Sequence, residues 1–327
     1  MLAVELKNLS YTYSAKTPYE KRALDGVSLA IEEGEFVGLI GATGSGKSTL
    51  IQHLNGLVKT QEGEVVVAGM NARDKKTLKK LRFKVGMVFQ YPEYQLFEDT
   101  VAKDVAFGPK NMKLEKEEVD RRVRRAMEVV GLPYDEFAER SPFELSGGEK
   151  RRAAIAGVIA MEPEILVLDE PVAGLDPAGR KEILGLVKKL HEEVSPTVIM
   201  VSHYMDDIAE MADRIVALRD GKVVADGSPA DVFGDREALA AAGLALPTAA
   251  RVVDRLAERG IELSRRIVTP AELVDALVKY RSEKAARAAE TGAETDTETD
   301  AETDTETDAA DGSAPAPTAD DGEGKDV

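Results

Sequence analysis

The stretch Leu39–Leu57, LIGATGSGKSTLIQHLNGL, constrains the fold more than any other part of the chain. It contains the pattern G-x-x-x-x-G-K-[ST], Gly41–Ser48, between an apolar strand predicted at Phe36–Ile40 and a helical run at Thr49–Leu57. Glycines let the backbone curl so that successive N–H groups point inward at an anion. The helix start adds unpaired N–H groups and the positive end of its dipole. The stretch therefore predicts a phosphate-binding loop at a strand-to-helix joint.

Each polar residue of this loop has a predicted role. Lys47 is expected to supply a positive charge to the β and γ phosphates of a nucleotide, and the Ser48 hydroxyl to supply a ligand for magnesium. The other predicted phosphate-site residues are Gly41, Gly44, Gly46 and Thr49. The alternative is a glycine-rich turn that only closes the joint, and the correct flanking elements argue against it.

A second apolar strand ends in two carboxylates. ILVLDEP, Ile165–Pro171, is typical of a buried parallel strand that delivers acidic side chains to its carboxyl edge. Asp169 is predicted to hold magnesium through water, and Glu170 to polarise the attacking water as general base. A strand followed by an acidic helix cap is the alternative, and the phosphate loop upstream weakens it.

Strand and helix alternate up to about residue 226, which favours a mostly parallel sheet covered by helices. The predicted strands are Phe36–Ile40, Gly63–Ala68, Val85–Phe89, Ile165–Leu168, Thr197–Val201 and Arg214–Leu218, and the predicted helices include Lys116–Val130 and Gly179–Glu192.

Composition places the acidic charge of the chain in its C-terminal tail. Residues 290–327 carry −13 of the formal net charge of −17, which leaves −4 for the rest. This balance gives no reason to expect a nucleic-acid partner. The absence of cysteine excludes disulfides and thiolate metal sites and agrees with a reducing cytosol. Neither a secretion signal nor a membrane-spanning run is expected, so the protein is not expected to enter a membrane by itself.

The C-terminal part changes character twice. Residues 228–284 carry apolar residues at helical spacing, with Pro229 and Pro270 near expected helix starts, and predict a small helical extension. From residue 285 to 327 apolar content collapses, and AETDTETD occurs twice in tandem at 293–308. Such a segment cannot offset the entropy of ordering and is predicted to be a disordered acidic tail.

Further motifs of the chain resemble the nucleotide-binding subunits of ABC transporters. LSGGEKRR (Leu145–Arg152) is similar to the ABC signature and VAGLDP (Val172–Pro177) to the D-loop, while Gln90 matches the Q-loop glutamine. His203 in IMVSH matches the switch histidine, and Tyr13 stands where the family places an aromatic ring on adenine. The resemblance covers residues 2–227 and departs at Glu149, where many members have Gln.

The resemblance implies an ABC-type nucleotide-binding domain over 1–227. It would have a mostly parallel sheet, an N-terminal antiparallel β portion and a helical subdomain at about 91–160. ATP and Mg²⁺ are the implied ligands. The predicted catalytic residues are Glu170, His203 and Gln90; the predicted magnesium ligands are Ser48, Gln90 and Asp169; and Tyr13, Ser146, Gly147, Gly148 and Asp176 join the loop residues in binding nucleotide.

The signature also predicts a dimer. Ser146, Gly147 and Gly148 precede an apolar-periodic helix and form a second anion-binding helix start, for which one site has little use. The resemblance implies that Ser146 and Gly148 contact a nucleotide held by a facing ATPase subunit, either identical or paralogous. Read alone, SGG before a helix indicates a simple N-cap.

A finer resemblance, to the ATPases of energy-coupling factor transporters, lies in FQYPEYQLFEDTVAKDVAFGP after Gln90 and in YTYSAKTPYEKRALDGVSL near the N-terminus. It implies a peripheral subunit at the cytoplasmic face of the cell membrane. Its partners would be a transmembrane coupling subunit and a membrane substrate-capture subunit for a vitamin or transition-metal ion. The same resemblance predicts a docking groove with Tyr91, Tyr94, Leu96 and Phe97 in it and an acidic rim of Glu93, Glu98 and Asp99.

Two other functions stay open from the sequence. The ATPase could serve another class of ABC importer or exporter, or it could be a soluble ABC protein of translation or DNA repair. The single phosphate loop, the lack of cysteine and the lack of long heptads disfavour the soluble alternative. The sequence does not identify the transported substrate, the composition of the ATPase dimer (homodimer or heterodimer) or the role of the acidic tail.

Overall fold

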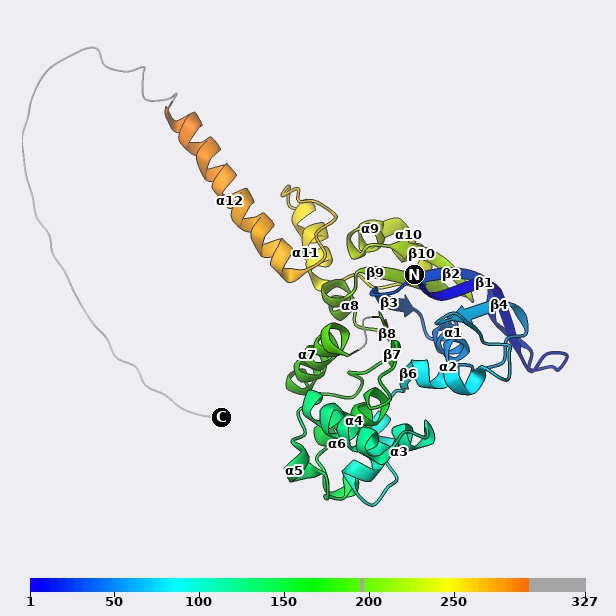
Figure 1. Ribbon diagram of the computed structural model, residues 1–327. Coiled ribbons are helices and arrows are strands. Elements are labelled where there is room, and N and C mark those ends of the chain that lie inside the picture. Colours follow the sequence, from blue (N-terminus) through cyan, green and yellow to red (C-terminus); the bar gives the residue numbers. More distant parts are fainter. Residues whose placement is uncertain (195–196, 294–327) are drawn as a thin grey trace, which may run out of the picture. The chain divides into compact units, whose positions relative to one another are not determined.

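Strands from both halves of the chain form one large sheet that carries the glycine-rich loop (Figure 1). The computed structural model describes residues 1–194 and 197–293. The sheet has the order β10–β9–β3–β8–β7–β6, in which all neighbours are parallel except the antiparallel pair of β9 and β10. Its strands are β3 (Phe36–Gly41), β6 (Val85–Val88), β7 (Ile165–Asp169), β8 (Thr197–Val201), β9 (Arg214–Arg219) and β10 (Lys222–Gly227).

A second, antiparallel sheet comes from the N-terminal part of the chain. Its order is β2–β1–β4–β5. The strands are β1 (Leu2–Tyr13), β2 (Lys21–Glu32), β4 (Glu62–Val67) and β5 (Met70–Asn71). Both sheets confirm the predicted α/β fold with an N-terminal antiparallel portion.

Alternating side chains of the large sheet enter two separate cores. Val37 and Leu39 of β3 pack with the antiparallel sheet and with helix α1 (Lys47–Leu54), whereas Phe36 and Ile40 pack with helices on the other face. β7 and β8 divide in the same way, because successive side chains of a strand point to opposite faces. The sheet is therefore buried on both faces, as its nearly continuous apolar strands predict.

Helices between β6 and β9 cover the face of the sheet opposite α1. They are α3 (Val101–Asn111), α4 (Lys116–Val129), α5 (Tyr134–Phe137), α6 (Gly147–Ile159), α7 (Pro177–Glu193) and α8 (Met205–Met211), with the 3-10 turns η1 (Pro92–Gln95) and η2 (Pro142–Glu144). Another helix, α2 (Leu78–Lys84), leads into β6. The helices from α3 to α6 fall within the predicted subdomain at 91–160.

Between β10 and residue 293, the last one described, the chain forms α9 (Pro229–Gly234), α10 (Arg236–Ala242), α11 (Thr248–Ala257) and α12 (Pro270–Ala293). Pro229 and Pro270 each begin a helix, as the sequence predicts. However, α12 continues beyond residue 285, where the sequence predicts disorder to begin. The segment Lys284–Ala289, KAARAA, consists of strong helix formers, which explains the longer helix. The rest of the predicted tail, 294–327, lies outside the described residues.

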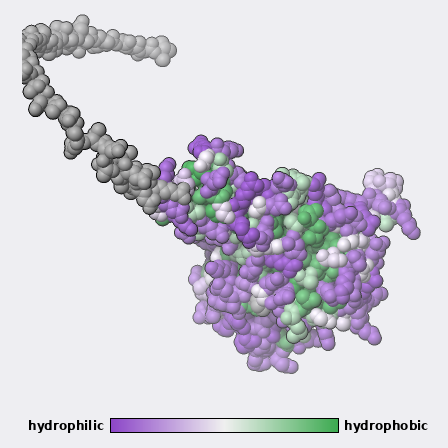
Figure 2. Space-filling model, turned by 90° about the horizontal axis from the view of Figure 1, so that it is seen from above, coloured by the Kyte–Doolittle hydropathy of each residue, from purple (hydrophilic) through white to green (hydrophobic). Residues whose placement is uncertain are grey.

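The surface seen in Figure 2 is mostly hydrophilic, with apolar residues gathered in one band across the middle of the main body. Among the residues that the structure describes, no helix combines the length and the apolar character needed to span a bilayer.

Candidate active site

The glycine-rich loop wraps around the ammonium group of Lys47. Gly46 has φ +109°, and a Cβ at this position would lie 2.4 Å from the carbonyl oxygen of Ala23, so no other residue fits without a shift of the backbone. The Lys47 side chain is buried. Its Nζ donates to the carbonyl oxygens of Gly41, at 2.7 Å, and Ala42, at 3.1 Å. The loop thus holds the lysine from inside, with its charge available to an anion in the loop.

Burial shifts the pKa values of two groups near this loop. Desolvation lowers the pKa of Lys47 from its ordinary value, and the nearby carboxylates of Glu170 and Asp169 partly offset that effect. Desolvation also raises the pKa of Asp169, and the negative charge of neighbouring Glu170 raises it further. Both charged forms therefore gain from a bound ligand of opposite charge: a phosphate for Lys47 and a cation for Asp169.

The three predicted catalytic residues meet at one point. A Glu170 carboxylate oxygen accepts a hydrogen bond from Nε2 of Gln90 at 3.1 Å, and the other lies 2.8 Å from Nε2 of His203. Gln90 follows β6, Glu170 follows β7 and His203 follows β8, so the carboxyl ends of parallel strands bring them together. Because its amide nitrogen faces Glu170, Gln90 keeps its amide oxygen for another ligand.

A cavity of about 520 Å³ joins these groups to the loop. Its lining consists of Tyr13, Lys21, Ala23, Thr43, Gly44, Gly46, Lys47, Ser48, Thr49, Gln90, Glu170 and His203. The hydroxyl of Tyr13 lies 3.2 Å from Oγ1 of Thr49, which ties the N-terminal hairpin to α1. Lys21 was not predicted, because a lysine in a solvated hairpin carries no signal of its own. Its partner across the hairpin, Tyr13, supplies the only hint.

The signature residues lie outside this cavity. Ser146 caps α6, where its side chain accepts a hydrogen bond from the Glu149 backbone N–H at 3.3 Å and Glu149 accepts one from the Ser146 N–H at 2.7 Å. This reciprocal pair is a capping box, and it gives Glu149 a local role where Gln is common. Gly147 and Gly148 form the first turn of the helix. Asp176 caps α7 by accepting from the Gly179 N–H at 2.8 Å.

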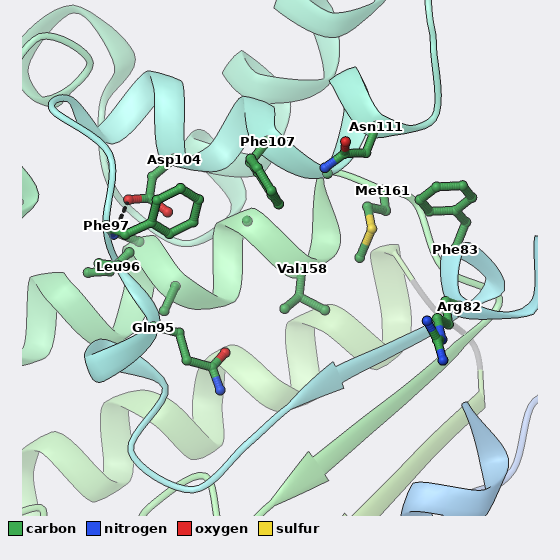
Figure 3. Close-up of a pocket in the computed structure, with 14 residues that line it drawn as sticks. Arg82, Phe83, Gln95, Leu96, Phe97, Asp104, Phe107, Asn111, Val158 and Met161 are labelled. Carbon is green, nitrogen blue, oxygen red and sulfur yellow. Dashed lines mark hydrogen bonds between the residues drawn. The ribbon is translucent and has the colours of Figure 1, made fainter. Parts of the chain in front are cut away.

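A separate groove of about 380 Å³ lies between α2, the segment after η1, α3 and α6 (Figure 3). The rings of Phe97 and Phe107 meet edge to face in it, with centroids 5.0 Å apart, while Val158 and Met161 line its α6 side (Figure 3). The complete lining is Arg82, Phe83, Gln95, Leu96, Phe97, Asp104, Phe107, Gly108, Asn111, Ala153, Ala154, Gly157, Val158 and Met161. The groove is therefore broader and more apolar than the sequence predicts.

The prediction of an acidic rim formed by Glu93, Glu98 and Asp99 is wrong, because none of the three lines this groove. Glu93 instead pairs with Arg151, whose side chain is only 2% exposed. Glu98 and Asp99 do not line it, and Asp99 pairs with Lys103 at 3.2 Å. Tyr91 and Tyr94 contact each other, not the groove.

The acidic residue of the groove is instead Asp104, which accepts hydrogen bonds from the backbone N–H groups of Phe97 (Figure 3) and Glu98, each at 2.9 Å. The direction of Glu93 was predicted wrongly because its partner, Arg151, lies far away in the sequence.

Comparison with known proteins places the chain in a family. A model described as ABC transporter matches residues 24–173. The energy-coupling factor transporter ATP-binding protein EcfA2 of Clostridium tetani is 50% identical over 285 residues, which cover 87% of this chain and 99% of that protein. The chain belongs to the energy-coupling factor transporter ATP-binding proteins.

Solved structures agree with this family. CbiO1 of Clostridium perfringens, described as part of the ABC transporter complex cbiONQ, matches with a TM-score of 0.66 and 36% identity, over 79% of this chain and 99% of that one. The ATP-binding cassette MJ0796, in a dimeric post-hydrolysis state bound to ADP and Pi, matches with a TM-score of 0.61 and 35% identity, over 69% and 98%. As an energy-coupling factor transporter ATP-binding protein, the chain is an ABC ATPase whose hydrolysis of ATP is coupled to transport.

Proposed function

We propose that the chain binds Mg²⁺-ATP in the cavity between the glycine-rich loop and the N-terminal hairpin. Lys47 and the loop amides would hold the phosphates, and Tyr13 would stack on adenine. Ser48, Gln90 and Asp169 would hold magnesium. Their hydroxyl, amide and carboxylate oxygens suit Mg²⁺, which usually takes one or two protein carboxylates beside substrate phosphates. When bound, the ion would supply positive charge to offset that of the phosphates.

Glu170 would take the proton of the attacking water. The observation that carries this assignment is the contact of both its oxygens, with Gln90 and with His203, at the mouth of the cavity. These two contacts fix the carboxylate in one direction, so that it faces the phosphate loop. His203 would keep Glu170 oriented, and the position of Gln90 would change when a nucleotide binds.

Glu170→Gln tests this assignment. We expect MgATP to bind with unchanged affinity while turnover falls at least about a hundredfold, the usual scale for loss of a general base. Lys47→Ala is expected to weaken MgATP binding itself. Glu164→Gln, at the other end of β7 and paired with Lys84, is the matched control and is expected to leave turnover unchanged. Parental turnover in Glu170→Gln would contradict the role of this residue.

We also infer that the working unit contains two ATPase subunits, identical or paralogous. The signature residues Ser146, Gly147 and Gly148 lie outside the cavity of their own chain. The Ser146 N–H is taken by Glu149, whereas the N–H groups of Gly147 and Gly148 in the first turn of α6 would suit a nucleotide on a facing subunit. Asp176 would contribute to the same interface through the segment that it caps. The dimeric cassette MJ0796, bound to ADP and Pi, supports this arrangement.

The remaining partners would be membrane proteins: a transmembrane coupling subunit and a subunit that captures a vitamin or a transition-metal ion. The chain would then act as a peripheral subunit at the cytoplasmic face of the membrane. The description of CbiO1 as part of a transporter complex supports such partners. The groove of Figure 3 suits a short helix of the coupling subunit, because its exposed aromatic residues can receive the apolar face of such a helix. Phe97 in this groove also follows Gln90 closely in the sequence, so the groove lies near the proposed nucleotide site along the chain.

A further inference from the structure

Lys21, on the N-terminal hairpin, reaches the glycine-rich loop at Gly44. It begins β2 and pairs directly with Tyr13, the last residue of β1, so the ring predicted to stack on adenine and this lysine lie next to each other where the connecting loop joins the two strands. Both residues line the cavity. A Cβ built on Gly44 of the loop would lie 3.6 Å from Nζ of Lys21, so the ammonium group sits over the loop backbone.

This ammonium group has no carboxylate partner among the residues that the structure describes, although acidic residues are near in sequence. Glu20 accepts a hydrogen bond from the Lys16 backbone N–H at 2.8 Å. Asp25 pairs with Arg22, at 2.6 Å, and with Lys222, at 3.1 Å. The neighbouring carboxylates are therefore engaged elsewhere, and the charge of Lys21 is left facing the cavity.

The two lysines of the cavity differ in how they are held. Lys47 is buried and donates to two loop carbonyls, whereas Lys21 is exposed and has its Nζ close to Gly44. An anion held by the loop N–H groups would lie in the cavity that both lysines line. An ammonium group gains most from a phosphate oxygen, because the hydrogen bond is then assisted by charge on both sides, whereas ribose hydroxyls offer no charge.

We propose that Lys21 is a second phosphate-binding lysine, supplied by the N-terminal hairpin, that contacts the polyphosphate chain of the bound nucleotide. The inference rests on the proposed nucleotide site. Two residues that face each other across the hairpin would then bind different parts of the nucleotide: Tyr13 the base and Lys21 the phosphates. Binding of nucleotide would then also fasten the hairpin to the loop through the phosphate chain.

The test is the affinity of the full chain for MgATP and MgADP, measured by calorimetry, in Lys21→Met and Lys21→Arg. We expect Lys21→Met to lower the affinity for both nucleotides about tenfold, the usual scale for losing a hydrogen bond to a charged group. Lys21→Arg is expected to retain most of the affinity. The dependence of binding on ionic strength should also become shallower in Lys21→Met, because one ion contact is lost.

Arg22→Met is the matched control, since Arg22 is the adjacent cation of β2 but pairs with Asp25 outside the cavity. It should bind MgATP within about twofold of the parent, because its charge makes no contact with the site. If Lys21→Met binds like the parent while Lys47→Ala binds weakly, the nucleotide site stands and the role of Lys21 is refuted. If the parent chain does not bind MgATP, the proposed function fails, and the inference fails with it.

Discussion

Glu170 occupies a backbone conformation that its side chain does not favour. Its φ is +50°, in the left-handed region, which costs a non-glycine residue about 1–3 kcal/mol. Its N–H donates to the carbonyl oxygen of Val201 at 3.0 Å, so the pairing of β7 with β8 continues up to Glu170, where the backbone leaves the strand. This turn aims the carboxylate between Gln90 and His203. Strain that persists at such a position agrees with a role in the reaction, because packing alone gives no reason to retain it.

His53 is the fully buried histidine of α1, the helix that begins in the phosphate loop. Its Nδ1 lies 2.7 Å from the carbonyl oxygen of Thr49, which can only accept, so Nδ1 carries the proton of the neutral ring. Its Nε2 has no hydrogen-bond partner within the described part of the chain. A proton on Nε2 would be buried without an acceptor, and burial accordingly lowers the pKa of His53 from its ordinary value of 6.5.

This pKa shift predicts a loss of stability in acid. Below about pH 6.5 the unfolded chain takes up a proton at His53 that the folded chain does not. The free energy of unfolding is therefore expected to fall from pH 6.5 down to the lowered pKa, with the full contribution present above pH 6.5. His53→Gln keeps a donor for Thr49 but cannot titrate, so urea unfolding at pH 7.5 and 5.5 should show a smaller difference than in the parent. An equal difference would show that other groups cause the acid sensitivity.

At the scale of elements, one buried side chain joins three segments that the reaction uses. Arg151 of α6 forms a two-point contact with Glu93 of η1, at 3.0 and 3.1 Å, and donates to the carbonyl oxygens of Pro171 and Ala173, just after Glu170. It thus connects the segment after Gln90, the signature helix and the D-loop. Because these contacts satisfy a buried guanidinium, moving one segment without the others would leave its charge unpaired.

Arg151→Met is expected to lower the free energy of unfolding by about 3–5 kcal/mol, because it leaves a partly buried Glu93 and two carbonyls without their donor. Combining it with Glu93→Gln should recover part of the loss, and urea unfolding of the single and double variants measures this coupling. Arg152→Met is the control, because the Glu182 partner of Arg152 is largely exposed, and should cost about 1 kcal/mol or less. Equal losses from Arg151→Met and Arg152→Met would mean that the Arg151 network adds nothing beyond a surface pair.

The sequence predicts those elements whose signals are local. The phosphate loop, the strand that ends at Asp169 and the helix starts at Pro229 and Pro270 all rest on neighbouring residues, and the structure contains them. Glu93 was misjudged because its direction depends on Arg151, which follows 58 positions later. Lys21 was missed for a similar reason, since only the pairing of β1 with β2 brings it to the loop. Long-range contacts of charged side chains therefore limit such predictions.

At the scale of the whole molecule, the proposed nucleotide cavity and the groove are joined by a few residues. Gln90 contacts Glu170 in the cavity, while Leu96 and Phe97, a few positions further on, line the groove. Between them, Glu93 holds the segment to α6. A change at Gln90 on nucleotide binding can thus reach the groove through a segment that is anchored in its middle, which suits rigid-body motion of a docked partner.

Phe97→Asp tests whether the groove carries that partner. Phe97 is 57% exposed and lies in the apolar floor, so a carboxylate there should weaken docking of an apolar helix while the fold and the ATPase rate of the isolated subunit change little. Phe143→Asp is the matched control, because Phe143 is 64% exposed but lies in η2, outside the groove. The measurement is the amount of membrane subunit that copurifies with each variant. This amount is expected to fall at least about tenfold for Phe97→Asp and to stay unchanged for Phe143→Asp. Equal copurification of both variants with the parent amount would show that the membrane partner docks on another surface.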